Sequence, residues 1–339
     1  MTRNTFEISW ISLWRILFFA SFVALMFLGR DVLVALFLAI IISSGLEVPV
    51  AMLERRGLPR TIGVILVFLL LIAAIVIVLY ALVPLIIVNL NTAFLNIQKA
   101  AGNAWWRQFF NIKAARSIND LMNRIVSDFL SNGASPLDVF SQVLGGVSLT
   151  ISVFITSFYL ILHKHGVEQF IRAVLPADYE ESALKIYENS KRKIGFWLRA
   201  QVMLSFVMGI LVWVTLSLLG VSYAPLLGAI AGILELVPFV GPIIAGAVSV
   251  LVALGGSTAL AVYTLIAFLA LQQFESNILV PLFMRRAVGL HPVIVIIALL
   301  MGIQISGFVG AIIAIPAAAM FQEAAEEWAG RKGIRPEAQ

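Results

Sequence analysis

The residues best placed to do chemistry are two carboxylates that stand in or beside long apolar runs. Glu235 is the only acidic residue among residues 200–274, and Glu275 follows that stretch directly, with Gln273 and Asn277 two positions to either side of it. Carboxylate and amide oxygens can bind a cation or hold a proton, so these four residues are predicted to bind or couple a substrate or ion. A carboxylate left unpaired in hydrocarbon costs roughly 2.5 kcal/mol or more, so Glu235 must face protein, water or a cation.

A structural interpretation of Glu235 stays open beside the functional one. The residue stands three positions before Pro238, where a helix is expected to break. Its carboxylate could accept hydrogen bonds from the exposed amides at that break, or pair with an arginine. The sequence alone does not separate the two interpretations.

Other catalytic or metal-binding patterns are missing from the sequence. It contains no GxxxxGK, HExxH or GxSxG motif, and it has no cysteine. Of the three histidines, His163 and His165 stand two positions apart and would face different sides of a helix, which favours a structural role over metal binding. His291 is the third. We therefore predict no catalytic residue, no metal and no cofactor, and a protein that is not an enzyme.

The elements that must position these residues are membrane helices. Hydrophobic residues make up 61% of the 339-residue chain and charged residues 12%, against about 25% charged in ordinary soluble domains. A run of 38 residues between Arg60 and Lys99 carries no charge, and about 20 helical residues cross a bilayer. We predict an all-α polytopic membrane protein with about six full transmembrane helices and two broken, re-entrant helical hairpins. The net charge of +5 is small and gives no reason to expect nucleic acid as a partner.

The two broken hairpins are predicted from helix-breaking residues inside apolar segments. The segment 225–254 carries Pro238, Gly241 and Pro242 at its middle, and the segment 290–321 carries Gly302 and Gly307. Discontinuous helices of this kind form substrate and ion sites in secondary transporters. Gly228 and Gly232 stand four residues apart and are predicted to form a close helix-packing face.

The apolar and polar segments divide the chain into six regions, and the excess of Lys and Arg gives their orientation. Both termini and Arg285 and Arg286 are predicted in the cytoplasm. The regions are N-terminal transmembrane helices (1–88), an extracytoplasmic helical cap (89–142), a transmembrane helix (143–162), cytoplasmic amphipathic helices (163–199), a C-terminal transport core (200–322) and a cytoplasmic tail (323–339).

Two blocks of the sequence carry a family resemblance. The stretches ELVPFVGPIIAG (235–246) and ESNILVPLFMRRAVGLHPVIV (275–295) resemble the hallmark blocks of the autoinducer-2 exporter (AI-2E) family. The resemblance implies a multi-pass protein of the bacterial inner membrane that forms a homo-oligomer. The family is named for export of the quorum-sensing furanone autoinducer-2, and some members are associated with sodium/proton antiport. By position, the resemblance assigns to the two blocks Pro238, Gly241, Pro242, Glu275, Asn277, Pro281, Gly289, His291 and Pro292.

Three functions compete at this stage. The leading hypothesis is a secondary transporter that exports a small polar molecule such as autoinducer-2 by alternating access around the broken segments. The alternative is a sodium (cation)/proton antiporter that uses Glu235 or Glu275. A membrane scaffold without transport is the third, and the broken helices argue against it, because a scaffold gains nothing from unsatisfied backbone groups in lipid.

Overall fold

The computed structural model describes residues 28–100, 146–284 and 289–331, together with a few isolated positions before residue 28 and Ser141. For residues 81–100 it describes the helix but not the side chains. Several predictions fall outside the described residues: most of the N-terminal region before residue 28, the cap beyond residue 100, Arg285 and Arg286, and the tail from residue 332.

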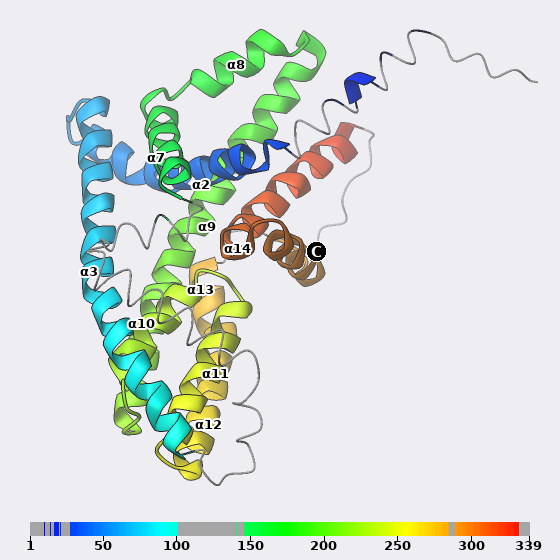
Figure 1. Ribbon diagram of the computed structural model, residues 1–339. Coiled ribbons are helices and arrows are strands. Elements are labelled where there is room, and N and C mark those ends of the chain that lie inside the picture. The colour runs from blue at the N-terminus through cyan, green and yellow to red at the C-terminus, as the bar shows by residue number, and fades with distance from the viewer. Residues whose placement is uncertain are drawn as a thin grey trace, which may run out of the picture.

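The described residues form helices joined by short turns and contain no strand (Figure 1). Two helices run through predicted region boundaries without a break, since α3 continues past residue 88 and α9 continues past residue 199. The helices are α2 (Arg30–Arg55), α3 (Arg60–Ala100), α7 (Val147–Leu162), α8 (Gly166–Val174), α9 (Ala177–Leu218), α10 (Ala224–Leu234), α11 (Val240–Leu254), α12 (Thr258–Phe274), the π-helix η2 (Glu275–Leu279), α13 (Val280–Met284) and α14 (Pro292–Arg331).

Five of these helical segments are long and apolar enough to cross a membrane, and α7 with α8, bent by 87°, could make a sixth. The prediction of an all-α polytopic membrane protein is confirmed. Helices α10 and α11 differ from the five, because their 11 and 15 residues extend only about 16 and 22 Å against a hydrocarbon core of about 30 Å. They form the first broken segment.

Close helix packing around α9 depends on glycine. A Cβ atom on Gly195 would lie 2.3 Å from the carbonyl oxygen of Ser44, so α2 and α9 touch backbone to backbone. Further along α9, a Cβ on Gly209 would lie 3.1 Å from the carbonyl oxygen of Gly228 and 3.3 Å from the Cα of Gly232, both in α10. The predicted packing face of Gly228 and Gly232 is confirmed, and α10 is held against α9 by it.

A half-buried arginine joins the neighbouring ends of three helices. Arg60, the first residue of α3, donates hydrogen bonds from Nε and Nη2 to the carbonyl oxygen of Ile161 at the end of α7. Its Nη2 also lies 2.9 Å from Glu47 of α2, and Nη1 lies 3.2 Å from Glu54 of the same helix. The three-way contact fixes the ends of α2, α3 and α7 relative to one another.

The second broken segment lies within α14, whose two arms run in different directions in Figure 1. The backbone leaves helical geometry at Ser306 and Gly307, and Gly307 has a φ of 57°, which favours glycine. In an unbroken helix, residues eight apart lie about 12 Å apart along the axis. A Cβ on Gly310 would instead lie 1.9 Å from the carbonyl oxygen of Gly302. The chain therefore folds back on itself, and the break lies where Gly302 and Gly307 predict it.

Candidate functional site

The first carboxylate of the site lies at the break between α10 and α11. Glu235 is the residue after the last of α10, and the backbone then turns over four residues into α11. Phe239, just before α11, has a left-handed φ of 64°. A Cβ on Gly241 would lie 2.0 Å from the carbonyl oxygen of Leu234, so the start of α11 packs directly on the end of α10. This turn places the Glu235 side chain inside the protein, where it is 2% exposed.

The second carboxylate lies at a change of helix type. Helix α12 passes at Glu275 into a five-residue π-helix before α13 begins. π-Helical turns are rare and occur frequently at functional sites. Glu275 faces inward and is 6% exposed, and its Oε2 accepts a hydrogen bond of 3.1 Å from the side-chain amide of Gln272.

The two carboxyl groups meet. The carboxyl groups of Glu235 and Glu275 lie close enough to interact directly, although 40 residues separate them in sequence. Two ionised carboxylates close together repel each other, and a shared proton or a bound cation relieves that repulsion. The arrangement is therefore one that holds a proton, or a cation in its place.

A buried glutamine completes this cluster from α9. Gln201 is fully buried, and its Nε2 donates a hydrogen bond to the backbone carbonyl of Glu235. It stands eight residues beyond Lys193, which is about 12 Å along the helix axis. The sequence analysis did not select Gln201. The available signal was its place as the first polar residue after Arg199 in a long apolar run.

Hydrogen-bonding capacity is left over around this cluster. Among the described residues, Oε1 of Glu235, Oε1 of Gln201 and the hydroxyl group of Ser205, one helical turn beyond Gln201, are buried and have no hydrogen-bond partner. The hydroxyl groups of Ser249 and Thr264 share this state further along α11 and α12. Buried polar atoms are nearly always satisfied, so unsatisfied ones need a reason. Here they could bind a polar solute, an ion or water as it passes between α9, α10, α11 and α12.

The other predicted site residues lie outside this cluster. Gln273 and Asn277 are exposed and hydrogen-bond to each other, with 3.2 Å between the Asn277 amide nitrogen and the Gln273 oxygen. They lie on the outer side of the turn that carries Glu275. The remaining elements are the exposed Pro281, Gly289, His291 and Pro292, which lead from α13 into α14. Pro238 lies in the turn after Glu235, and Pro242 lies in the first turn of α11.

The residues that could have bound a metal do not form a metal site. The described part of the chain contains no group of three or more His, Asp or Glu residues arranged to hold an ion. The ring of His163 stacks on Tyr159, and His165 pairs with Glu168 at 2.8 Å. Nδ1 of His291 accepts a hydrogen bond from the amide of Val293 at the start of α14.

A comparison with known families decides what kind of protein carries this cluster. A family model described as "AI-2E family transporter" matches residues 16–330. The chain belongs to the AI-2E transporter family. Both hallmark blocks lie inside the match, and the Glu235–Glu275 contact joins the first residue of one block to the first residue of the other.

Individual relatives agree with the membership in the AI-2E family. YueF of Bacillus subtilis (strain 168), which is named as a transport protein, is 25% identical over 79% of this chain and 76% of its own length. YrrI of the same organism, also named as a transport protein, is 24% identical over 86% of this chain and 85% of its own length. PerM of Escherichia coli (strain K12), named as a permease, is 25% identical over 90% and 89%. Each match covers most of both chains, so an AI-2E membrane transporter is the class that these relatives support.

Proposed function

We propose that this AI-2E family protein is a secondary transporter of the bacterial inner membrane that exports a small polar molecule such as autoinducer-2. The observation that carries the proposal is the buried pair of Glu235 and Glu275, which stands at two changes of helix geometry and has unpartnered buried polar atoms on Glu235 itself and on Gln201. A permanent structural site would satisfy those atoms. A site that binds and releases a polar solute leaves them free in one of its states.

The short helices support alternating access as the mechanism. Neither α10 nor α11 crosses the bilayer alone, and both end at the carboxyl pair or beside it. Tight backbone contacts hold α10 on α9, so movement is more easily divided between this pair and the α12–η2 segment. In this scheme the carboxyl pair opens to one side of the membrane at a time, with Gln201 and Gln272 as neighbouring hydrogen-bond donors.

The carboxyl pair also favours a second candidate, sodium (cation)/proton exchange. Two carboxyl groups in contact can exchange a shared proton for a cation, as an antiporter requires. The difference between the candidates is which species crosses, since both use the same pair.

Flux measurements on the purified protein in proteoliposomes test both candidates together. Vesicles carry an imposed pH or sodium gradient, and uptake of autoinducer-2 and of sodium is compared with that of protein-free vesicles. We expect saturable autoinducer-2 flux that depends on the gradient. Sodium flux driven by a pH gradient, without autoinducer-2 flux, would establish the antiporter instead. Absence of both fluxes in a correctly inserted protein would contradict the transport proposal.

A further inference from the structure

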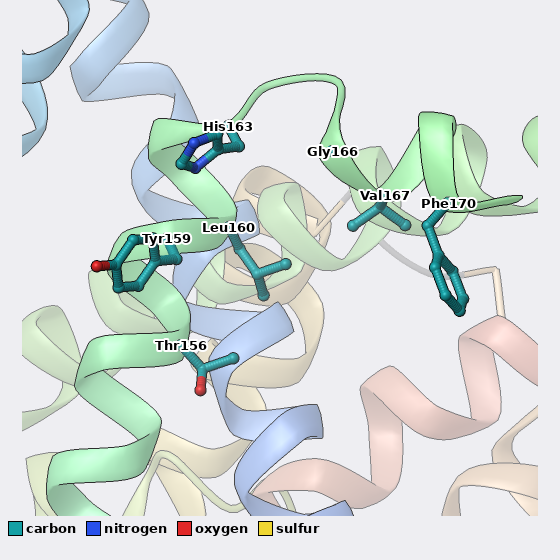
Figure 2. A pocket seen from close by; sticks show the side chains of 7 residues that line it. All are labelled: Thr156, Tyr159, Leu160, His163, Gly166, Val167 and Phe170. Atoms are coloured by element: carbon teal, nitrogen blue, oxygen red, sulfur yellow. The ribbon is translucent and has the colours of Figure 1, made fainter. Parts of the chain in front are cut away.

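The corner between α7 and α8 is separate from the carboxyl cluster and is hollow. Seven residues line a space of about 300 Å³ there: Thr156, Tyr159, Leu160, His163, Gly166, Val167 and Phe170. In Figure 2 the side chains of Val167 and Phe170 hang from α8 on the side that faces along α7. The two helices meet at 87°, so the hollow is the inside of a right-angled elbow.

Helix α8 is amphipathic, and no other part of the described chain buries its apolar face. Val167, Phe170, Ile171 and Val174 follow the spacing of one helical stripe, and the polar residues lie on the other side. The structure buries no residue of α8, and Phe170 is 67% exposed. A short amphipathic helix at a right angle to a membrane-crossing helix is typical of a helix lying in the membrane surface with its apolar side toward the acyl chains.

The turn at the corner of the elbow carries a cation. His163 and Lys164 form the turn between the helices, and the His163 ring stacks on Tyr159 with 6.0 Å between ring centroids. Within the described residues, no acidic group pairs with the ammonium group of Lys164, whereas Arg172 further along α8 is paired with Glu180 at 2.6 Å. An apolar hollow next to a turn that carries the exposed Lys164, unpaired in the described part of the chain, complements a molecule with a chain and an anionic head.

We propose that this elbow is a binding site for an anionic phospholipid. The acyl chain would lie against Leu160, Val167 and Phe170, and the headgroup phosphate would lie at Lys164 and His163. An apolar solute alone would leave the cation unused, and a soluble phosphate would leave the apolar face exposed to water. Only a lipid satisfies both parts of the site, and the membrane in which the protein lies supplies it.

Photo-crosslinking of the full-length protein in neutral detergent tests this proposal. The probe is phosphatidylglycerol with a diazirine in one acyl chain, and modified residues are mapped by peptide mass spectrometry. We expect labelling to concentrate in residues 156–170. Because one basic residue near an anionic lipid contributes on the order of 1 kcal/mol, unlabelled phosphatidylglycerol should compete about fivefold better than phosphatidylcholine. Glycerol 3-phosphate should not compete, since it lacks the chain.

Three variants assign the two halves of the site. Lys164→Gln should remove the preference, so that phosphatidylglycerol and phosphatidylcholine compete equally, while labelling of the elbow persists. Phe170→Gln should lower labelling of the elbow by both lipids. Phe206→Gln changes an equally exposed residue of α9 and should change neither result.

The outcomes are decisive even if one variant fails to fold. Labelling spread evenly over the exposed apolar residues of α7 and α9, or equal competition by both lipids in the native protein, would overturn the proposal. Lys164→Gln is a surface change that keeps the hollow intact, so an unchanged lipid preference in that variant would contradict the headgroup assignment by itself.

Discussion

The two broken segments of this transporter share a tight backbone reversal but differ in the side chains that they carry. At both, the chain folds back so tightly that glycine backbones touch other backbones, at Gly241 against Leu234 and at Gly310 against Gly302. The α10–α11 break then adds a buried carboxylate that meets a second one. The α14 break has no ionisable side chain between residues 292 and 322.

The comparison distinguishes a break that only supports helix packing from one that also carries a chemically active side chain. The α14 hairpin buries Leu299, Val309 and Ile313 against α2 and α9, so its break serves packing. The α10–α11 break serves packing and also presents charge and free hydrogen-bonding groups. Steric changes should therefore damage both breaks, whereas changes of charge or polarity should matter only at the first.

The largest expected effect comes from adding one methyl group at either break. In Gly241→Ala and Gly310→Ala the new Cβ would lie 2.0 and 1.9 Å from a backbone carbonyl oxygen, and backbone cannot move aside as a side chain can. We expect flux in proteoliposomes to fall at least about 100-fold in Gly241→Ala, since a small misplacement of a site costs that much, and to fall in Gly310→Ala through loss of correctly folded protein.

Gly63→Ala is the matched control for these two variants. It adds the same methyl group to a helical glycine, with its nearest neighbour at an ordinary 3.6 Å. Its flux should be unchanged. Normal flux in Gly241→Ala, measured on protein shown to be inserted, would remove the tight turn from the mechanism.

The second prediction compares the removal of a charged or polar side chain at each of the two breaks. Glu235→Gln keeps the shape of the side chain but removes its exchangeable charge, so flux should fall at least about tenfold, with Glu235→Asp retaining part of it. Gln304→Leu removes the exposed polar group next to the α14 break and should change flux less than about twofold. Flux of both proteins is measured at several pH values.

The order of the Glu235 variants distinguishes the two interpretations of this residue. If Glu235 only accepts hydrogen bonds at the break, Gln should be tolerated at least as well as the shorter Asp. An active Glu235→Gln protein with an unchanged pH response would end the coupling hypothesis and make the two breaks equivalent.

The third prediction concerns Gln201, which links α9 to the first break. Gln201→Leu removes the donor to the Glu235 carbonyl and leaves that buried oxygen unpaired, at a cost of about 1–3 kcal/mol. We expect a lower midpoint of thermal unfolding in detergent and a flux loss smaller than that of Glu235→Gln. A variant as stable as the native protein would show that this hydrogen bond does not hold the turn.

Much of the fold was predictable because membrane helices leave a strong signal. Apolar runs without charge predict the spans, and Pro or Gly in the middle of such runs predicts the two breaks. The choice of Glu235 as a site residue was predictable for the same reason, since an isolated carboxylate in an apolar run is energetically costly unless it faces protein, water or a cation. Its contact with Glu275 was not predictable, because it depends on how α12 packs beside the α10–α11 turn.

The choice of Gln273 and Asn277 shows where nearness in sequence fails. Residues two positions apart on a helix point to nearly opposite sides, so both neighbours of Glu275 face away from the carboxyl pair. Gln272, three positions before Glu275, is the one that contacts it. The π-helix has no clear signal in the sequence, since Ser276, Ile278 and Leu279 are ordinary residues for an α-helix.

The smallest expected effect lies where the second arm of α14 meets α9 through ion pairs outside the apolar layer. Lys193 lies 2.5 Å from Glu323, whose side chain is 10% exposed and also accepts a hydrogen bond from Asn189. Lys185 lies 2.7 Å from Glu327 but is itself 61% exposed. Exposed pairs contribute little and are screened by salt, whereas loss of one partner leaves a buried charge poorly compensated.

Lys193→Met should therefore lower the stability of the protein by about 1 kcal/mol, and Lys185→Met should not change it measurably. Thermal unfolding of both variants in detergent, at low and at high salt, measures the difference. Flux should stay near the native value in both, because these pairs hold the arm of α14 that carries no ionisable group at its break. A large loss of flux in Lys193→Met, with the fold intact, would mean that the α14 hairpin takes part in transport. The division between a chemical break and a packing break would then be wrong.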